Sequence, residues 1–392
     1  MEQRERFRLS KRVFSGLLVR VSAPELTTRQ ALLTLNGLRR IGPVSLTRLL
    51  EAFGGNPIAV LEASRSEWMR VQGVGSETAD SLQAWRDFPL QREERNLRER
   101  NGDFLIQEDE EYPPLLREIH DSPIGLYRLG QIPKKPFVAI VGTRKSTLYG
   151  LGMAKKLAAD LTRVGFCVVS GMARGIDTAA HEGALDAGGD TVAVFGCGLD
   201  VIYPPENLDL FKRICLQGAV LSEFPFGRRA DRQTFPMRNR VVSGMSEGVI
   251  VVESAAAGGA MITARFAGEQ GRQVLAVPGR VDQPSSAGCH QLIRDGAVLV
   301  RSASDVVEEL AASIRFPVMT ADCSEPLLEN GEQAFVGAEA TVMQCFDGGA
   351  VLRTEEIART SGLSATDLAA TLTGLELKRA LIRGPDGAFE AR

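Results

Sequence analysis

The stretch Val138-Ala-Ile-Val-Gly-Thr-Arg-Lys-Ser146 decides the fold. Its apolar, largely β-branched run is typical of a buried strand, and the run ends at Gly142. Apolar residues then recur with helical spacing over 151–161, so the stretch predicts a strand, a tight turn and the start of a helix. Such a helix start offers free N–H groups and the positive end of the helix dipole. With Arg144 and Lys145 beside it, we expect it to bind phosphate.

Two more strand-to-helix turns of the same kind follow. Residues 167–177 place a glycine-bracketed turn, with Arg174, between a short strand and a helix that reaches His181. Residues 191–198 form a third apolar run, which ends in Gly196-Cys-Gly198. Strands that alternate with amphipathic helices indicate a parallel sheet covered on both faces. Because ligands bind beyond the carboxyl ends of such strands, we expect the three glycine turns to converge on one site.

The same alternation continues toward residue 300. It predicts an α/β fold with a mostly parallel sheet. Within this region, Phe235-Pro-Met-Arg-Asn-Arg240 places an asparagine between two arginines. Further strands are expected at 219–222, 248–253, 274–279 and 297–300, and further helices at 206–217, 258–264 and 288–295.

The core is expected to lie between two smaller modules. Glycine-punctuated helical patterns at 38–50 and 71–82 predict a helix-hairpin-helix (SAM-like) module, which either offers amides to a DNA phosphate or serves only for packing. The C-terminal pattern predicts a winged helix, and the scarcity of basic residues along its second helix favours protein contact over DNA reading. The predicted parts are a flexible tail (1–23), the SAM-like module (24–90), the core (91–312), a linker (313–335) and the winged helix (336–392).

Composition limits the function classes. The formal net charge of −3 means that any nucleic-acid binding must come from a local basic pocket. Six cysteines without Cys-x-x-Cys spacing favour reduced thiols in a cytoplasmic protein. Three histidines far apart in the sequence assemble no metal motif, and no apolar run reaches the length of a membrane span. We therefore expect a cytoplasmic chain without a metal or another cofactor.

The common enzyme signatures do not match. The first turn lacks Gly-x-Gly-x-x-Gly, no acidic residue follows the second strand, and a P-loop motif is absent. Ser170, Asp177 and His181 could be imagined as a hydrolytic triad, but Ser170 lacks the Gly-x-Ser-x-Gly elbow. We interpret Asp177 and His181 as bracing the turn. No catalytic residue is predicted.

Glu253, at the carboxyl end of a predicted strand, is a further candidate acid. We interpret it as a partner of Arg238 or Arg240 and as structural support of the pocket. What remains is a set of hydrogen-bond donors without an evident nucleophile. Such a pocket could take a nucleotide or the backbone of a single strand, whose unpaired bases could stack on guanidinium groups. The candidate DNA- or phosphate-binding residues are Gly142, Thr143, Arg144, Lys145, Ser146, Ser170, Gly171, Arg174, Gly175, Gly196, Gly198, Tyr203, Arg238, Asn239, Arg240 and Thr263.

These residues belong to segments that resemble the bacterial DNA-processing protein A family (DprA, also called Smf). The resemblance implies an extended Rossmann-like core that binds single-stranded DNA, forms a homodimer and helps load RecA onto incoming DNA during natural transformation. It places the family's DNA-contacting arginine at Arg144. The segments are Val141-Gly-Thr-Arg144, Ser170-Gly-Met-Ala-Arg-Gly-Ile-Asp-Thr-Ala-Ala-His181, Gly196-Cys-Gly-Leu-Asp200, Tyr203-Pro204, Phe235-Pro-Met-Arg-Asn-Arg240, Val252-Glu253, Ile262-Thr263, Ala276-Val-Pro-Gly279, Gly288 and Leu292-Ile-Arg-Asp-Gly-Ala297.

The chain departs from the family pattern at the edge of the pocket. Pro205 stands where some relatives carry a lysine, so that phosphate contact is absent here or is replaced by Arg174 or Lys145. Thr143 stands where serine is commoner, and Ala257-Gly-Gly-Ala260 replaces a segment richer in hydroxyl groups.

Two other functions remain open on the sequence. One is a nucleotide-hydrolysing enzyme of the lysine-decarboxylase-like group, whose Pro-Gly-Gly-x-Gly-Thr-x-x-Glu signature is absent from this chain. The other is a core that only dimerises and leaves DNA binding to the two terminal modules.

Overall fold

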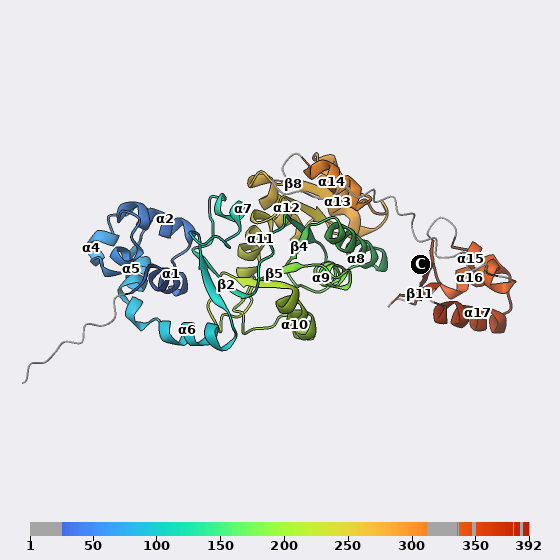
Figure 1. Ribbon diagram of the computed structural model, residues 1–392. Helices are drawn as coiled ribbons and strands as arrows, with labels where there is room; N and C mark the ends of the chain where they lie inside the picture. Colours follow the sequence, from blue (N-terminus) through green and yellow to red (C-terminus); the bar gives the residue numbers. More distant parts are fainter. Residues whose placement is uncertain are drawn as a thin grey trace, which may run out of the picture. The chain divides into compact units, whose positions relative to one another are not determined.

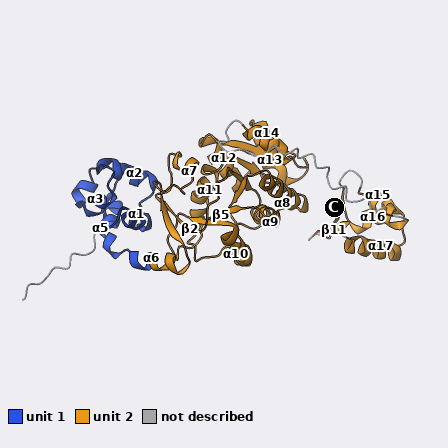
Figure 2. Ribbon diagram, viewed as in Figure 1, with its two compact units in different colours: residues 1–94 blue, residues 95–392 orange. Residues whose placement is uncertain are grey.

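The computed structural model describes residues 26–311, 335, 337–346, 350–378, 380–384 and 387–391. The chain divides into two compact units, residues 1–94 and 95–392 (Figure 2). The predicted tail lies outside the described residues, as does the predicted linker apart from residue 335. The boundaries expected at residues 90 and 312 stay predictions.

The described part of the first unit is helical. Thr27 and Ser64 begin their helices with capping boxes, in which the N-cap hydroxyl and the third helical side chain exchange hydrogen bonds. Buried leucines and Trp68 form the interior, and the indole N–H of Trp68 donates to the carbonyl of Val60 at 2.7 Å. The helices are α1 (Thr28–Gly37), α2 (Pro43–Ala52), α3 (Pro57–Glu62), α4 (Arg65–Trp68) and α5 (Ser76–Gln83), with α6 (Leu90–Glu99) crossing the boundary between the units.

Within residues 103–299, nine strands form one sheet in the order β1-β2-β6-β5-β4-β3-β7-β8-β9. Of these, β2, β5, β4 and β8 can be followed across the sheet in Figure 1. All neighbours from β6 to β9 are parallel, whereas β1 and β2 add an antiparallel edge. The predicted mostly parallel sheet is confirmed, although the pattern did not predict β1 or the pairing of β2. The strands are β1 (Asp103–Ile106), β2 (Gly125–Gly130), β3 (Phe137–Val141), β4 (Cys167–Ser170), β5 (Thr191–Phe195), β6 (Gly218–Ser222), β7 (Gly248–Val251), β8 (Gln273–Ala276) and β9 (Val298–Leu299).

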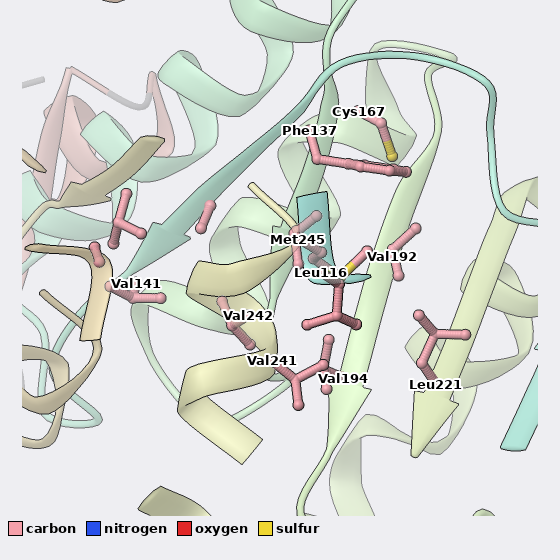
Figure 3. Close-up of a cluster of buried hydrophobic side chains, with 14 of the residues drawn as sticks. Leu116, Phe137, Val141, Cys167, Val192, Val194, Leu221, Val241, Val242 and Met245 are labelled. Atoms are coloured by element: carbon pink, nitrogen blue, oxygen red, sulfur yellow. The ribbon is translucent and has the colours of Figure 1, made fainter. Parts of the chain in front are cut away.

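Helices cover both faces of the sheet because its central strands are apolar on both sides. On β3, Val138 and Ile140 pack into one buried cluster with α8, α9 and α14, whereas Ala139 and Val141 face a second cluster with α11, α12 and α13. Figure 3 shows the second cluster, where side chains from the α11 region lie against those of β5. The helices of this unit before residue 312 are α7 (Pro114–Arg117), α8 (Leu148–Arg163), α9 (Ile176–Asp186), α10 (Leu208–Gln217), α11 (Thr234–Gly244), α12 (Gly259–Glu269), α13 (Ala287–Arg294) and α14 (Ala303–Leu310).

The strand order reverses at β3. From β3 the chain moves outward through β4, β5 and β6 on one side, and it returns to pair β7 against the other side of β3. Loops at the carboxyl ends of β3 and β7 therefore lead away from each other and leave a crevice, which is where ligands bind in sheets of this kind.

The described C-terminal residues contain three helices and a small antiparallel sheet in the order β10-β12-β11. Their interior is built from apolar side chains that include Ile357, Leu368 and Phe389. The predicted helices at 354–360 and 364–377 are confirmed, whereas the winged-helix interpretation stays a prediction. The elements are α15 (Ala338–Gln344), β10 (Val351–Leu352), α16 (Thr354–Ser361), α17 (Ala365–Leu377), β11 (Leu381–Arg383) and β12 (Phe389–Ala391).

None of the helices in the described parts of the chain combines the length and the apolar character that a bilayer span requires.

Candidate functional site

A cavity of about 360 Å³ lies at the carboxyl ends of β3, β4 and β7. Four segments that are distant in the sequence form its walls: the turn after β3, the turn after β4 with the start of α9, helix α11, and the loop after β7 with the start of α12. It lies where the strand order reverses. Of the three glycine turns that were expected to converge on one site, those after β3 and β4 line this cavity, whereas Gly196 of the third lines a small adjoining cavity. The lining residues are Val141, Gly142, Thr143, Arg144, Gly171, Ala173, Asp177, Phe235, Pro236, Arg238, Asn239, Val242, Ala255, Gly258, Gly259, Ala260, Ile262 and Thr263.

Arg238 is the buried cation of the cavity. Its side chain is 5% exposed, and Nη1 donates to the carbonyl of Val194 at 3.1 Å, while Nε has no hydrogen-bond partner among the described residues. A Cβ atom at Gly171 would lie 1.3 Å from Nη1, so only glycine leaves room for the guanidinium there. Burial lowers the pKa of Arg238, and the neighbouring Asp177 carboxylate opposes that shift.

Asp177 holds the turn between β4 and α9. Its Oδ2 accepts a hydrogen bond from the backbone N–H of Ala173 at 3.3 Å, and burial raises its pKa against the charge of Arg238. His181 lies deeper, where Nδ1 is 2.7 Å from the Thr191 hydroxyl. Because that hydroxyl donates to the carbonyl of Val168, Nδ1 is the donor to Thr191. Burial lowers the pKa of His181 to about 3, which favours the neutral imidazole. Asp177 therefore braces the turn, whereas His181 ties α9 to β5.

A cation and two aromatic rings lie in a row beside the cavity. The guanidinium carbon of Arg144 is 4.6 Å from the centroid of the Phe235 ring, and the Phe235 ring is 6.0 Å from that of Tyr203. Arg144 is exposed and forms no ion pair with any described residue. A guanidinium held over an aromatic face presents both a positive charge and a flat surface to a ligand.

The start of helix α12 opens into this cavity. Gly258 is its N-cap and has no side chain that could satisfy the first N–H groups. Gly258, Gly259 and Ala260 all line the cavity, so the positive end of an eleven-residue helix faces it.

The start of helix α8 is occupied instead. Oε2 of Glu253 accepts the backbone N–H of Thr147 at 2.9 Å, and Oε1 accepts the Thr147 hydroxyl at 2.6 Å. The Thr147 hydroxyl oxygen in turn accepts the N–H of Gly150 at 3.1 Å. The sequence predicted phosphate at this helix start, and the structure places the protein's own carboxylate there. The predicted pairing of Glu253 with Arg238 or Arg240 is therefore wrong.

Arg240 lies outside the cavity, contrary to its place among the predicted contacts. It is 4% exposed, and its Nη2 lies 2.5 and 2.7 Å from the two carboxylate oxygens of Glu223. Nε lies 3.3 Å from Asp121. Side chains two residues apart on a helix point in different directions. Arg238 therefore faces the cavity, whereas Arg240 faces Glu223 and Asp121.

The remaining predicted residues fall into three groups. Thr143, Asn239 and Thr263 line the main cavity, while Gly196 and Tyr203 line a small adjoining cavity shared with Phe235 and Arg238. Ser170 is buried, and its hydroxyl donates to the carbonyl of Ile140 at 2.6 Å. The predicted residues that line neither cavity are Lys145, Ser146, Ser170, Arg174, Gly175, Gly198, His181, Arg240 and Glu253.

Sequence reasoning missed Phe235, Gly258 and Gly259 as cavity residues. The signal for Phe235 was an aromatic residue directly before a Pro-x-Arg segment, and the signal for the glycines was their position at the start of a helix that follows a strand. Among the described residues, no group of three histidine, cysteine, aspartate or glutamate side chains could hold a metal ion.

Comparison with known proteins gives consistent matches. The sequence profile of the family described as DNA recombination-mediator protein A matches residues 103–311. Protein Smf from Synechocystis is 36% identical over 311 residues, which cover 76% of this chain and 73% of that protein. DNA processing protein DprA from Streptococcus pneumoniae is 44% identical over 203 residues, covering 51% and 72%. Its X-ray structure aligns with a TM-score of 0.64 at 34% identity, covering 73% of this chain and 99% of that one.

Proposed function

Because the chain belongs to the DNA recombination-mediator protein A family, we propose that it binds single-stranded DNA and acts as a recombination mediator. The observation that carries the proposal is the cavity at the point where the strand order reverses, with Arg144 over Phe235 at its edge and the start of α12 in its wall. Each of these groups can contact either the phosphates or the bases of a single strand.

The backbone phosphates would meet positive charge from two sources. Arg144 has no acidic partner among the described residues, so its guanidinium can pair with a phosphate without first breaking an ion pair. The uncapped start of α12 adds backbone N–H groups and the helix dipole, and Arg238 contributes a buried charge beneath them.

The bases would stack on Phe235 and Tyr203. Stacking on an aromatic ring requires a base whose face is free, which a single strand offers and a duplex does not. The row of cation and rings therefore favours single strands over duplexes, while its contacts carry no sequence information.

We propose binding without a chemical step. The polar side chains in the cavity wall are the arginines, Asn239, two threonines and Asp177, and the carboxylate of Asp177 accepts the N–H of Ala173 at its own turn. A nucleophile paired with a base, as covalent catalysis requires, is not among these described residues.

The wider role follows from the resemblance described above. We propose that the protein is a cytoplasmic homodimer that protects incoming DNA and helps load RecA during natural transformation. The helical N-terminal module and the C-terminal module, with its small sheet, would act as helix-hairpin-helix and winged-helix partners of the core.

The test is fluorescence anisotropy of a labelled oligonucleotide, single- and double-stranded, at two salt concentrations. We expect preferential single-strand binding that falls with salt, and about tenfold weaker binding for Arg144→Ala because one phosphate contact and one stacking partner are lost. Arg163→Ala, an exposed arginine at the far end of α8, is the matched control. Equal affinity for the wild type and Arg144→Ala would remove the cavity as the DNA site.

A further inference from the structure

An ion pair lies beside the row of cation and rings. Arg174 belongs to the turn between β4 and α9, and Glu206 to the short 3-10 helix Pro205–Asn207. Two hydrogen bonds join them: Nη2 lies 3.1 Å from Oε2, and Nε donates to Oε1. The two side chains are 54% and 51% exposed, so solvent and ligands reach the pair.

The protein holds these two residues in register. Asn207 is buried, and its carboxamide donates to the carbonyl of Met172 at 3.1 Å and to the hydroxyl of Thr178 at 2.9 Å. The segment of Glu206 is thereby fixed against the turn of Arg174. A pair positioned by buried hydrogen bonds loses less side-chain entropy than most exposed pairs, which contribute little.

The Arg174–Glu206 ion pair lies next to the candidate site. Tyr203 interacts with Arg174 through its hydroxyl and packs toward Phe235, whose ring lies under Arg144. Arg144, Phe235, Tyr203 and Arg174 thus form a strip in which two aromatic rings lie between two guanidinium groups. A strand that stacks bases on both rings would bring a phosphate to each end of the strip.

We propose that Arg174 is a second phosphate contact and that Glu206 masks it, so that Glu206 sets the affinity for single-stranded DNA. This inference rests on the proposed function. A carboxylate and a phosphodiester each carry one negative charge, and both accept two hydrogen bonds from a guanidinium. Binding at Arg174 therefore exchanges one anion for another, whereas the guanidinium of Arg144 can meet a phosphate without giving up an ion pair.

Removing the charge of Glu206 makes Arg174 available as the second phosphate contact. Glu206→Gln keeps the shape of the side chain but removes its charge, so Arg174 is free to pair with a phosphate. We expect this variant to bind an oligothymidylate of about 12 nucleotides about threefold to tenfold more tightly, and the slope of log affinity against log salt to steepen by about 0.7, as for one more phosphate contact on a single strand.

Three further variants separate the release of Arg174 from a simple change in the net charge of the protein. Asp209→Asn removes the same charge from a nearby exposed residue, which pairs with Lys212, and we expect a change of less than about twofold. Arg174→Gln leaves the Glu206 carboxylate without its partner beside the strand, so we expect this variant to bind more weakly than the wild type. In the double variant Arg174→Gln/Glu206→Gln, the gain of Glu206→Gln should disappear.

Two results would contradict the proposal that Glu206 masks Arg174. One is a gain for Glu206→Gln no larger than for Asp209→Asn. The other is a gain that persists in the double variant, since the cause would then be charge alone. Failure of the proposed function gives a different result, in which Arg144→Ala binds as the wild type or the wild type binds no single strand at all.

Discussion

Helices α8 and α12 start at the same edge of the sheet, after the adjacent strands β3 and β7, yet their starts have opposite surroundings. The start of α8 is closed by side chains, because Glu253 accepts the N–H of Thr147 and the Thr147 hydroxyl accepts the N–H of Gly150. The start of α12 has a glycine as its N-cap and opens into the cavity. The difference teaches that a helix start becomes an anion site only where the fold leaves its donors unused.

Removing the carboxylate from the closed start is the strongest way to break this comparison. Glu253 is 2% exposed, so Glu253→Ala leaves the half-buried N–H and hydroxyl of Thr147 without their acceptor. We expect the free energy of unfolding to fall by about 3 kcal/mol, as measured by urea denaturation.

Glu253→Gln is the matched control for that experiment. Its amide oxygen still accepts one hydrogen bond while its NH₂ group opposes a donor, so about half of the loss is expected. An alanine variant as stable as the wild type would mean that the carboxylate does not close the start of α8.

Helix α9 starts at the same edge, after β4, which lies on the other side of β3 from β7, and its buried His181 allows a test by pH. Burial lowers the pKa of His181 to about 3, whereas an unfolded chain has a histidine pKa near 6.5. Below about pH 6.5 the unfolded state binds a proton at this histidine, whereas the folded state does not. The free energy of unfolding therefore falls as the pH falls. From pH 6.5 to 5 we expect a loss of about 1.5 kcal/mol that is absent in His181→Gln.

The measurement is urea unfolding at several pH values. Burial raises the pKa values of Asp177 and Glu223, which contributes in the opposite direction, but these groups remain in both proteins and cancel in the difference. His120→Gln, at an exposed position, should retain the slope of the wild type. The same slope in His181→Gln would show that His181 does not stay neutral in the folded state.

The features that local sequence encodes were predictable. Apolar β-branched runs such as Val138 to Val141 marked the buried strands, and the glycine turns after them marked the edge where the cavity lies. The residue types that favour phosphate binding stood at those turns, and Arg144, Arg238 and Thr263 do line the cavity.

The features that depend on distant partners were not predictable. Glu253 reaches the start of α8 across 106 residues of sequence, and Arg240 is buried against Glu223 by the packing of α11. Helix α11 itself was missed, because Pro236 interrupts the pattern although proline is compatible with the first turn of a helix. Which helix start stays open is decided by tertiary contacts that no local pattern contains.

The central claim is that the open start of α12 faces the bound strand, and one substitution tests it directly. A side chain at Gly259 would have open space, so Gly259→Asp gives α12 the kind of carboxylate that closes α8, while Gly259→Asn adds nearly the same shape without charge. In fluorescence anisotropy with a labelled single strand, we expect Gly259→Asp to bind about tenfold more weakly and Gly259→Asn to stay within about twofold of the wild type. Equal binding by all three proteins would contradict the account, because the strand would then not approach α12.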